Sequence, residues 1–463
     1  MSKRIETDGL GAVEVDNNKY WGAQTQRSIA YFSIGNNKMP LEVIHALAIV
    51  KKACAFSNYD FGDLSKDHCA LITKAADEII SGKLDDHFPL HVWMTGSGTQ
   101  ANMNVNEVIS NRAIKLADSS AVLGTKFPIH PNDHVNKSQS SNDVFPTAMH
   151  IAIALQLKNK LIPAVQKMSD NLMEKTKKWH HIVKIGRTHM QDAVPLTLGQ
   201  EFSGYYTLLQ QNIDRLNFSL DEVCGLVIGG TAIGTGLNAP KDFGKKTTGY
   251  IAKMTGVDFF SVSNKFAAQG SHDALVALMS QIKVLANSLF KIANDIRLLS
   301  CGPRAGFYEL LLPSNEPGSS IMPGKVNPTQ CEAITMACVQ VFGYDSAVTI
   351  AGSAGLLEMN VYKPLIVYNI LESISLLSDS CSNFTDFLLK NLQPNKKKIN
   401  QYLHDSLMLV TALTPIIGYD KASQMAHHAH KNNISLSDAN DSLGFLSQAE
   451  FNKAINPEKM INS

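Results

Sequence analysis

One loop, residues 318–328, holds the densest group of polar residues in the chain and reads Gly-Ser-Ser-Ile-Met-Pro-Gly-Lys-Val-Asn-Pro. Glycines let such a loop bend and close over a ligand. Lys325 supplies a compact positive charge, and Asn327 supplies an amide that can donate to an anion. The alternative is a polar loop that only caps a helix. The length and strictness of the pattern favour a site for a small anion.

A helix is expected directly after this loop. Asn327-Pro-Thr-Gln330 has the pattern of an N-cap followed by proline at the first helical position and then a glutamine. Anions bind at helix N-termini because the backbone N–H groups there are unpaired and the helix dipole is positive. The helix would therefore strengthen the anion site.

Three further segments carry small polar groups that suit an anion. Residues 95–104 contain Gly-Ser-Gly-Thr, and residues 138–143 read Ser-Gln-Ser-Ser-Asn-Asp. Both could surround a carboxylate, and both are also ordinary turn sequences, so neither is decisive alone. Residues 130–133, His-Pro-Asn-Asp, could bind an anion or form a turn, and the sequence leaves these two possibilities open.

One histidine is placed for acid–base chemistry. Residues 186–192 read Gly-Arg-Thr-His-Met-Gln-Asp, so Thr188 and His189 come shortly before Pro195 and a long helical pattern. A lone histidine is more often structural than catalytic. His189 lies among polar residues in a loop, however, and histidine is the residue type that titrates near neutral pH. It is our candidate acid–base residue.

Several classes of site are excluded by pattern. The chain has no P-loop, dinucleotide fingerprint, nucleophile elbow or His-Glu-x-x-His spacing. Its seven cysteines are scattered and never form a Cys-x-x-Cys pair, so neither a disulfide framework nor a zinc site is indicated. The remaining hydroxyls, amides, one lysine and one histidine suit the binding of small anions and the movement of protons.

The composition is that of an ordinary globular protein. Of 463 residues, 44% are apolar and 18% charged, and the net charge of +1 indicates neither a nucleic acid nor a membrane as partner. The first residues resemble neither a secretory signal nor a transit peptide, so we expect a cytoplasmic protein. No run of eighteen uninterrupted apolar residues occurs, and we expect a soluble chain.

Helical spacing of apolar residues dominates the chain. The first 40 residues read as an irregular arm with short extended pieces, and residues 41–58 as a helix. Five long helices are predicted, a number that points to a bundle, with a kink expected at Pro163 in the first of them: residues 144–180, 196–223, 272–299, 328–350 and 360–389.

The helix at 272–299 carries an apolar stripe wide enough to suggest subunit packing as well as an internal core. A helix buried inside one large monomeric bundle is the open alternative. A breaker followed by lysines at 392–398 suggests a boundary. We expect three domains: a mostly helical one at 1–138, a central long-helix bundle at 139–392, and a small helical one at 393–463.

These motifs resemble the fumarase and aspartase superfamily, whose hallmark is Gly-Ser-Ser-x-Met-Pro-x-Lys-x-Asn, present here at 318–327. The resemblance runs from Lys-Tyr-Trp-Gly-Ala-Gln-Thr at 19–25 to Gly-Tyr-Asp-Lys-Ala at 418–422, which is nearly the whole chain. Gly-Arg-Thr-His189 and Pro-Gly324-Lys are similar to the class II fumarases. The aspartate ammonia-lyases instead have Gly-Arg-Thr-Gln and Pro-Ala-Lys.

The resemblance implies a mainly α, three-domain fold with a central five-helix bundle. It also implies a homotetramer with a twenty-helix core, in which each active site is built from three subunits. The implied reaction is the reversible hydration of fumarate to (S)-malate by anti addition of water through a carbanion-like intermediate, a step of the tricarboxylic acid cycle. Neither a cofactor nor a metal is implied.

The family's functional residues carry over by motif. The implied catalytic residues are His189, Ser319, Lys325, Asn327 and Glu332, with Ser319 as base and His189, paired with Glu332, acting on water; which of Ser319 and His189 takes the carbon proton is left open. The implied substrate-binding residues are Ser97, Gly98, Thr99, Ser140, Ser141, Asn142, Thr188, Ser320, Lys325, Val326 and Asn327. A secondary anion site would comprise His130, Pro131, Asn132 and Asp133.

Two other functions stay open at this point. An ammonia-lyase acting on aspartate would use the same scaffold, although His189 argues against it. A catalytically silent structural protein is also possible because folds persist after activities are lost.

Overall fold

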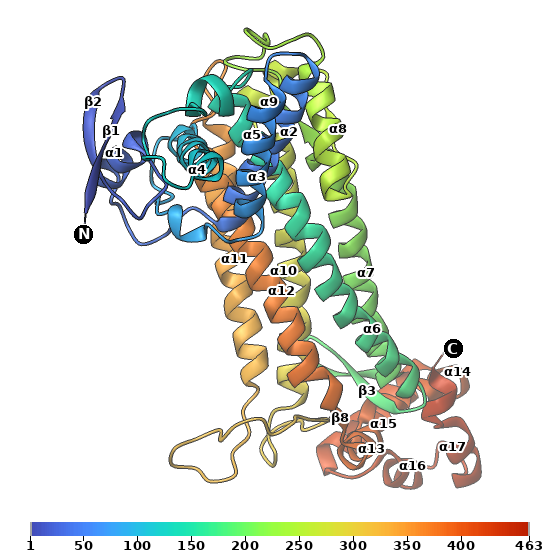
Figure 1. Ribbon diagram of the computed structural model, residues 1–463. Coiled ribbons are helices and arrows are strands. Elements are labelled where there is room, and N and C mark those ends of the chain that lie inside the picture. The colour runs from blue at the N-terminus through green and yellow to red at the C-terminus, as the bar shows by residue number, and fades with distance from the viewer. Residues whose placement is uncertain (1, 462–463) are drawn as a thin grey trace. The chain divides into compact units, whose positions relative to one another are not determined.

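The computed structural model describes residues 2–461 and is mainly helical (Figure 1). Within these residues the chain falls into two compact units: the first comprises 2–163, 214–286 and 339–378, and the second comprises 164–213, 287–338 and 379–461. These units do not follow the three predicted domains, whose boundaries stay a prediction.

The first unit is built around α2 (Leu41–Asp60), which packs against α3 (Lys66–Ile80), α5 (Ser141–Gln156) and α8 (Phe243–Thr255). Its other elements are β1 (Lys3–Asp8), β2 (Gly11–Asp16), α1 (Ala23–Tyr31), η1 (Asp85–His87), α4 (Thr99–Ala117), η2 (Pro131–Val135), η3 (Leu157–Leu161), β5 (Gly225–Leu226), β6 (Phe260–Ser261) and α9 (Lys265–Gly270). β1 and β2 pair antiparallel, and β5 and β6 pair parallel. The short extended pieces predicted in the first 40 residues are β1 and β2, whereas the helix α1 was not predicted.

The five predicted long helices are all found. The first is the continuous run of α5, η3 and α6 (Ile162–Lys178), and the others are α7 (Leu198–Val223), α10 (Asp273–Leu299), α11 (Thr329–Ser353) and α12 (Lys363–Phe387). The stripe expected along α10 is fully buried at Leu275, Leu278, Ile282, Leu285, Leu289, Ile292 and Ile296. Each such side chain stabilises the fold by about 1.5–3 kcal/mol.

The helix expected at 144–180 is present, with an irregularity at the predicted place: α5 and α6 are joined by the π-helical segment η3 just before Pro163, which has no N–H to complete the α-helical ladder. One local prediction was wrong. The helix expected to be capped by Asn327 begins at Thr329, and the N–H groups of Cys331 and Glu332 donate to Pro328 O. Asn327 instead donates its amide to Gly318 O across the loop.

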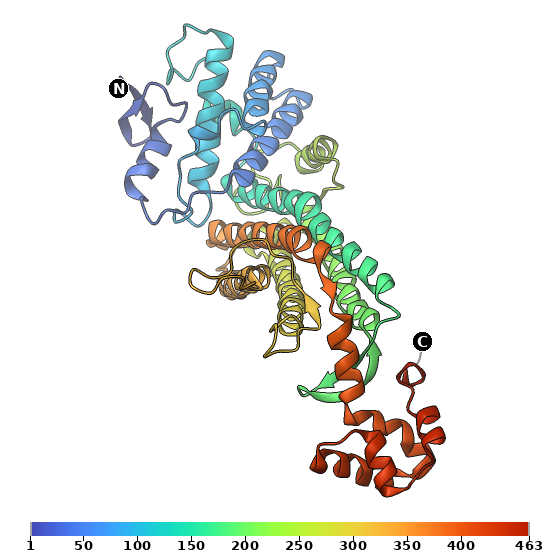
Figure 2. The same cartoon turned by 90° about the horizontal axis from the view of Figure 1, so that it is seen from below.

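The second unit carries two antiparallel pairs, β3 (Val183–Thr188) with β4 (Gln191–Thr197) and β7 (Leu310–Leu311) with β8 (Gln393–Pro394). Its C-terminal helices, red in Figure 2, share a small apolar core around Leu413, Met425 and Ala439. They are α13 (Lys396–Asp405), η5 (Leu407–Leu413), α14 (Thr414–Ile417), α15 (Tyr419–Asn432), α16 (Leu436–Leu443), α17 (Gln448–Ala454) and η6 (Pro457–Met460), and the short η4 (Leu389–Asn391) precedes them in the chain.

By length and composition alone, α10 and α11 could each cross a membrane. Core helices of globular proteins have the same properties, and α10 carries Lys283, Lys291, Asp295 and Arg297 within its length.

Candidate functional site

In the first unit, two of the predicted polar segments meet through their hydroxyl groups. Thr99 Oγ1, at the start of α4, lies 2.7 Å from Ser141 Oγ, at the start of α5, and 2.9 Å from Ser97 Oγ. Helix N-termini and hydroxyls both suit an anion. The segments at 95–104 and 138–143, each inconclusive alone, therefore form one polar cluster.

Gly98 explains why this cluster can be so tight. Its φ of +77° is a left-handed conformation, and a Cβ added there would lie 2.2 Å from the ring of Phe145 on α5. Only glycine lets the turn before α4 approach α5 this closely.

Asp143 anchors the segment that holds Ser140, Ser141 and Asn142, and sequence reasoning missed it. Its buried carboxylate accepts from the N–H of Ser140 in a capping box, and its other oxygen accepts at 2.9 Å from the N–H groups of both Gly229 and Thr231. Burial raises the pKa of this carboxyl, and the backbone donors oppose that rise. Its position three residues after Ser140 was the available signal.

Lys51 holds the loop that leads into the same segment. This buried lysine of α2 donates to Asn136 Oδ1 and Gln139 Oε1, both at 2.9 Å. Burial lowers the pKa of Lys51 to about 7. A lysine within the apolar run of α2 was a signal that the sequence analysis did not use.

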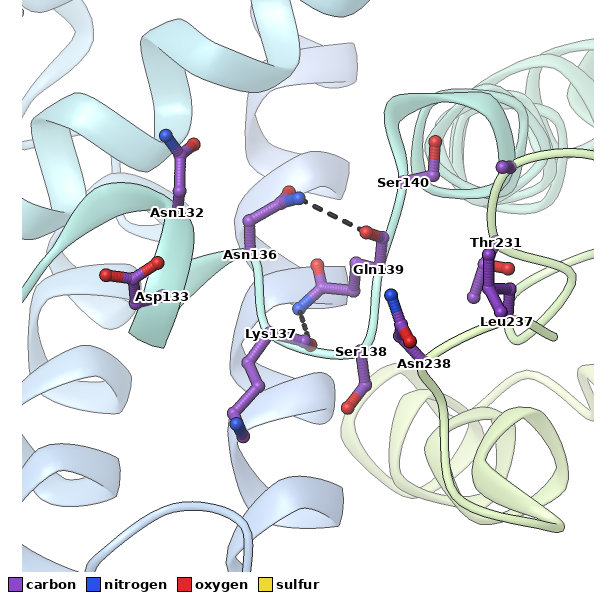
Figure 3. A pocket seen from close by; sticks show the side chains of 11 residues that line it. Asn132, Asp133, Asn136, Lys137, Ser138, Gln139, Ser140, Thr231, Leu237 and Asn238 are labelled. Carbon is purple, nitrogen blue, oxygen red and sulfur yellow. Dashed lines mark hydrogen bonds between the residues drawn. The ribbon is translucent and has the colours of Figure 1, made fainter. Parts of the chain in front are cut away.

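A pocket of about 450 Å³ joins Ser140 to two members of the predicted secondary site (Figure 3). In it Asn136 and Gln139 brace the loop by donating to the carbonyl oxygens of Gln139 and Lys137, at 3.3 and 2.9 Å. The lining residues are Asn132, Asp133, Asn136, Lys137, Ser138, Gln139, Ser140, Thr231, Ala232, Leu237 and Asn238.

The segment 130–133 forms the start of η2, with His130 as the residue that caps it. His130 Nδ1 accepts from the N–H groups of Asn132 and Asp133, at 3.2 and 3.1 Å. His134 Nδ1 in turn accepts from His130 N–H at 2.8 Å, and the His134 ring lies 4.4 Å from that of His68. Because Nδ1 of His130 is already engaged, its Nε2 is the ring nitrogen left for an anion.

In the second unit, the 318–328 loop is closed by its own hydrogen bonds. Gly318 N–H donates to Lys325 O at 3.1 Å, while the Asn327 amide donates to Gly318 O. Ser319 Oγ accepts from the N–H groups of Ile321 and Met322, at 3.3 and 3.1 Å. The loop thus places two backbone donors on the Ser319 oxygen.

The side chains expected to meet substrate are accessible on this loop. Ser320, Lys325 and Val326 are exposed, and Ser319 and Asn327 are half-buried. A cavity of about 370 Å³ lies against the loop and is lined by Arg297, Ser300, Cys301, Gly302, Pro303, Tyr308, Leu312, Gly324, Lys325, Val326, Asn327 and Pro328. Arg297 is a second cation that the sequence analysis did not single out.

Thr188 and His189 stand exposed at the tip of the β3–β4 hairpin. His189 and Met190 both have positive φ, 55° and 63°, which is unfavourable for residues with a Cβ. Glu332 lies on α11 with its carboxylate 3.8 Å from the Arg297 guanidinium. The pairing of His189 with Glu332 stays a prediction.

The candidate residues are thus divided between the two units. The hydroxyl cluster and residues 130–133 belong to the first unit, while the hairpin tip and the 318–328 loop belong to the second. Among residues 2–461, no three His, Cys, Asp or Glu side chains are grouped to hold a metal ion.

Comparison with known proteins decides the family. A lyase family model matches residues 11–343, and a model of the fumarase C C-terminus matches residues 409–462. A class II fumarate hydratase of Thermosynechococcus vestitus is 56% identical over 99% of this chain and 98% of its own length. The chain belongs to the class II fumarate hydratase family. The branch predicted from His189 and Gly324 is therefore confirmed.

Other relatives agree over the same span. The class II fumarate hydratase of Rickettsia prowazekii is 54% identical, with 99% of both chains covered. The crystal structure of a class II fumarase from Schistosoma mansoni is 43% identical, covers 99% of both chains and superposes with a TM-score of 0.97. The predicted mainly α fold of this family is thereby confirmed.

Proposed function

We propose that this chain catalyses the reversible hydration of fumarate to (S)-malate, with Ser319 as the base that acts on carbon. The observation that carries the proposal is the pair of backbone N–H groups that donate to Ser319 Oγ within the family's hallmark loop. The full-length similarity to fumarate hydratases supports the substrate.

The carbon proton of malate is hard to remove because the resulting carbanion lies beside a carboxylate and concentrates negative charge. Donors placed in advance where that charge develops lower the barrier most. In our proposal, Lys325 and Asn327 serve this purpose. Ser320 and Val326 contact the substrate from the same loop.

A serine hydroxyl is a weak acid, so Ser319 must be activated before it can take a proton. The N–H groups of Ile321 and Met322 would stabilise its alkoxide, and Lys325, six residues later on the same loop, supplies positive charge. The elimination then balances simply. Ser319 takes the proton from carbon, the electron pair forms the double bond, and hydroxide leaves with a proton from His189.

His189 would protonate the departing hydroxide and, in the reverse direction, deprotonate the attacking water, with Glu332 orienting its ring. The hydroxyl cluster of the first unit would hold the substrate carboxylates through Ser97, Thr99, Ser140, Ser141 and Asn142, together with Gly98 and the Thr188 hydroxyl. Residues 130–133 would form a secondary anion site that shares the pocket of Ser140.

We infer that the active protein is a homotetramer whose active sites are shared between subunits. Helix α11 supports this inference. In its most apolar stretch of eighteen residues, only 28% of the stretch is buried within the chain. Met336, Val339 and Ile350 lie exposed along it. An apolar stripe of this kind favours burial against another subunit. A cytoplasmic location also stays a prediction.

The first experiment follows the ultraviolet absorbance of fumarate when purified protein receives L-malate or, separately, L-aspartate. Fumarate formed from malate alone supports the proposal. Fumarate formed from aspartate would assign the chain to the ammonia-lyases, and no product from either substrate would indicate a silent scaffold.

The variant His189→Asn tests the acid–base role. Turnover of malate should fall at least a hundredfold, in the range that loss of a general acid–base group produces. The mass measured by light scattering should stay that of wild type because His189 is exposed on a turn. Dissociation of the variant would remove the basis for assigning its lost turnover to chemistry.

A further inference from the structure

A cluster of four charged side chains lies in the second unit, and none of the four has been assigned a role above. Glu309, fully buried, receives Arg187 on one carboxylate oxygen at 2.8 Å and Lys184 on the other at 2.7 Å. Lys184, only 1% exposed, also donates to Glu201 at 2.8 Å. Lys184 and Glu309 are buried and compensate each other's charge, while Glu201 and Arg187 complete the pairing from partly exposed positions.

Residues of this cluster precede both segments of the unit that carry proposed catalytic residues, the hairpin tip and the 318–328 loop. Lys184 and Arg187 lie on β3, and Arg187 is two residues before His189. Glu309 directly precedes β7, where the chain begins the segment that leads to Ser319 and Lys325. One carboxylate thus connects the hairpin to the start of the loop.

Glu309 is itself held firmly by the backbone. Its N–H donates to Leu299 O at the end of α10, and its C=O accepts from Asn395 N–H, both at 2.8 Å. The Arg187 guanidinium also stacks 4.4 Å from the centre of the Phe307 ring. The arginine is therefore fixed by a carboxylate and an aromatic face that do not depend on the hairpin.

The hairpin needs such an anchor. Its tip places His189 and Met190 at positive φ, a turn that favours asparagine and glycine and costs about 1 kcal/mol or more for each other residue. The β3–β4 register also shifts between Ile185 and Arg187. A strained tip beside an irregular register keeps its conformation only when the surrounding contacts hold it.

We propose that Glu309 is a positioning residue for the reaction: it fixes the hairpin that presents His189 and the root of the loop that presents Ser319 and Lys325. This inference rests on the roles proposed above for those three residues. The proposal applies whether the two segments serve the same active site or different ones, because Glu309 contacts the hairpin at Arg187 and lies at the start of the chain segment that leads to the loop.

The variant Glu309→Gln tests it. The amide keeps the size of the side chain but loses its charge, and it turns an NH₂ group toward one of the two cations. We expect kcat for malate to fall at least tenfold with KM changed less than threefold, because a misplacement near 1 Å can cost about a hundredfold in rate. The matched control is Asp345→Asn, which removes a carboxylate paired at 2.7 Å with Lys283 on other helices and should keep wild-type kcat.

A double-variant cycle separates positioning from loss of stability. Arg187→Gln and Glu309→Gln should each lower kcat/KM, and the double variant should be no worse than the poorer single one, because both act through one contact. Independent, multiplying losses would overturn the proposal. So would a folded Glu309→Gln protein with kcat within threefold of wild type.

A second variant covers the case in which Glu309→Gln does not fold. Arg187→Lys leaves Glu309 paired but loses the planar fork and the stacking on Phe307, so kcat should fall at least tenfold without loss of the fold. Full activity in this variant would overturn the proposal. Wild-type turnover of malate, measured in the same series, distinguishes failure of this inference from failure of the proposed reaction.

Discussion

Replacing Gly318 by alanine should abolish most of the activity while leaving the fold intact. A Cβ at this position would lie 2.1 Å from Lys325 O and 2.8 Å from its carbonyl carbon. Ordinary contacts of a Cβ begin near 3.4 Å, so residues 318 and 325, which face each other across the loop, must move apart by about 1.3 Å. The bonds from Gly318 N–H to Lys325 O and from the Asn327 amide to Gly318 O would both weaken.

The consequence for catalysis follows from that displacement. Lys325 and Asn327 would move by about 1 Å from where charge develops, which corresponds to a loss of about a hundredfold in kcat/KM, or about 2.7 kcal/mol of transition-state stabilisation. The free energy of unfolding should change by about 1 kcal/mol or less, because the loop is largely exposed and buries little apolar surface.

The assay compares initial rates of fumarate formation from malate with urea unfolding of the same preparation. Gly324→Ala is the matched control in the same loop: its φ of +80° makes alanine strained, but no atom lies within 4 Å of the added Cβ. It should lose about tenfold or less. Activity of Gly318→Ala within threefold of wild type would refute the reasoning, and equal losses in both variants would show that backbone strain, not the collision, controls the loop.

Two further outcomes are expected in the first unit. Asp143→Asn turns an NH₂ group toward the N–H groups of Gly229 and Thr231, leaving buried donors unpaired at about 1–3 kcal/mol each, so urea unfolding should shift to lower concentration and KM for malate should rise. The pKa of His134 is lowered, by burial first and then by His68, with His130 and Lys137 adding to the lowering and Asp133 opposing it. The unfolded chain therefore binds this proton first as pH falls below about 6.5, and stability should decline there. His134→Asn, whose amide oxygen can still accept from His130 N–H, should show a smaller decline in urea midpoints between pH 8 and 5; an unchanged slope would contradict this assignment.

Much of the chemistry could be predicted from sequence because it lies in continuous segments. The 318–328 loop contains the proposed base Ser319, Lys325 and Asn327 within nine residues, and the glycines that shape it are visible beside them. The long helices were also predictable, since an apolar stripe such as that of α10 repeats with the helical period whatever the helix packs against. An error arose at a helix end: α11 begins at Thr329, and the Asn327 amide bonds Gly318 O across the loop instead of capping the helix.

Other features depend on tertiary structure because they join residues far apart in the chain. Thr99 meets Ser141 from 42 residues away, Lys51 supports a loop 85 residues later, and Glu309 reaches Arg187 across 122 residues. Periodicity and local propensity describe each segment's own conformation and do not encode which distant segment will neutralise a buried charge. The sequence by itself therefore determined the long helices and the family, and it supplied the candidate reactive side chains. Only the packing of the chain decided which buried carboxylates and lysines hold those side chains in place.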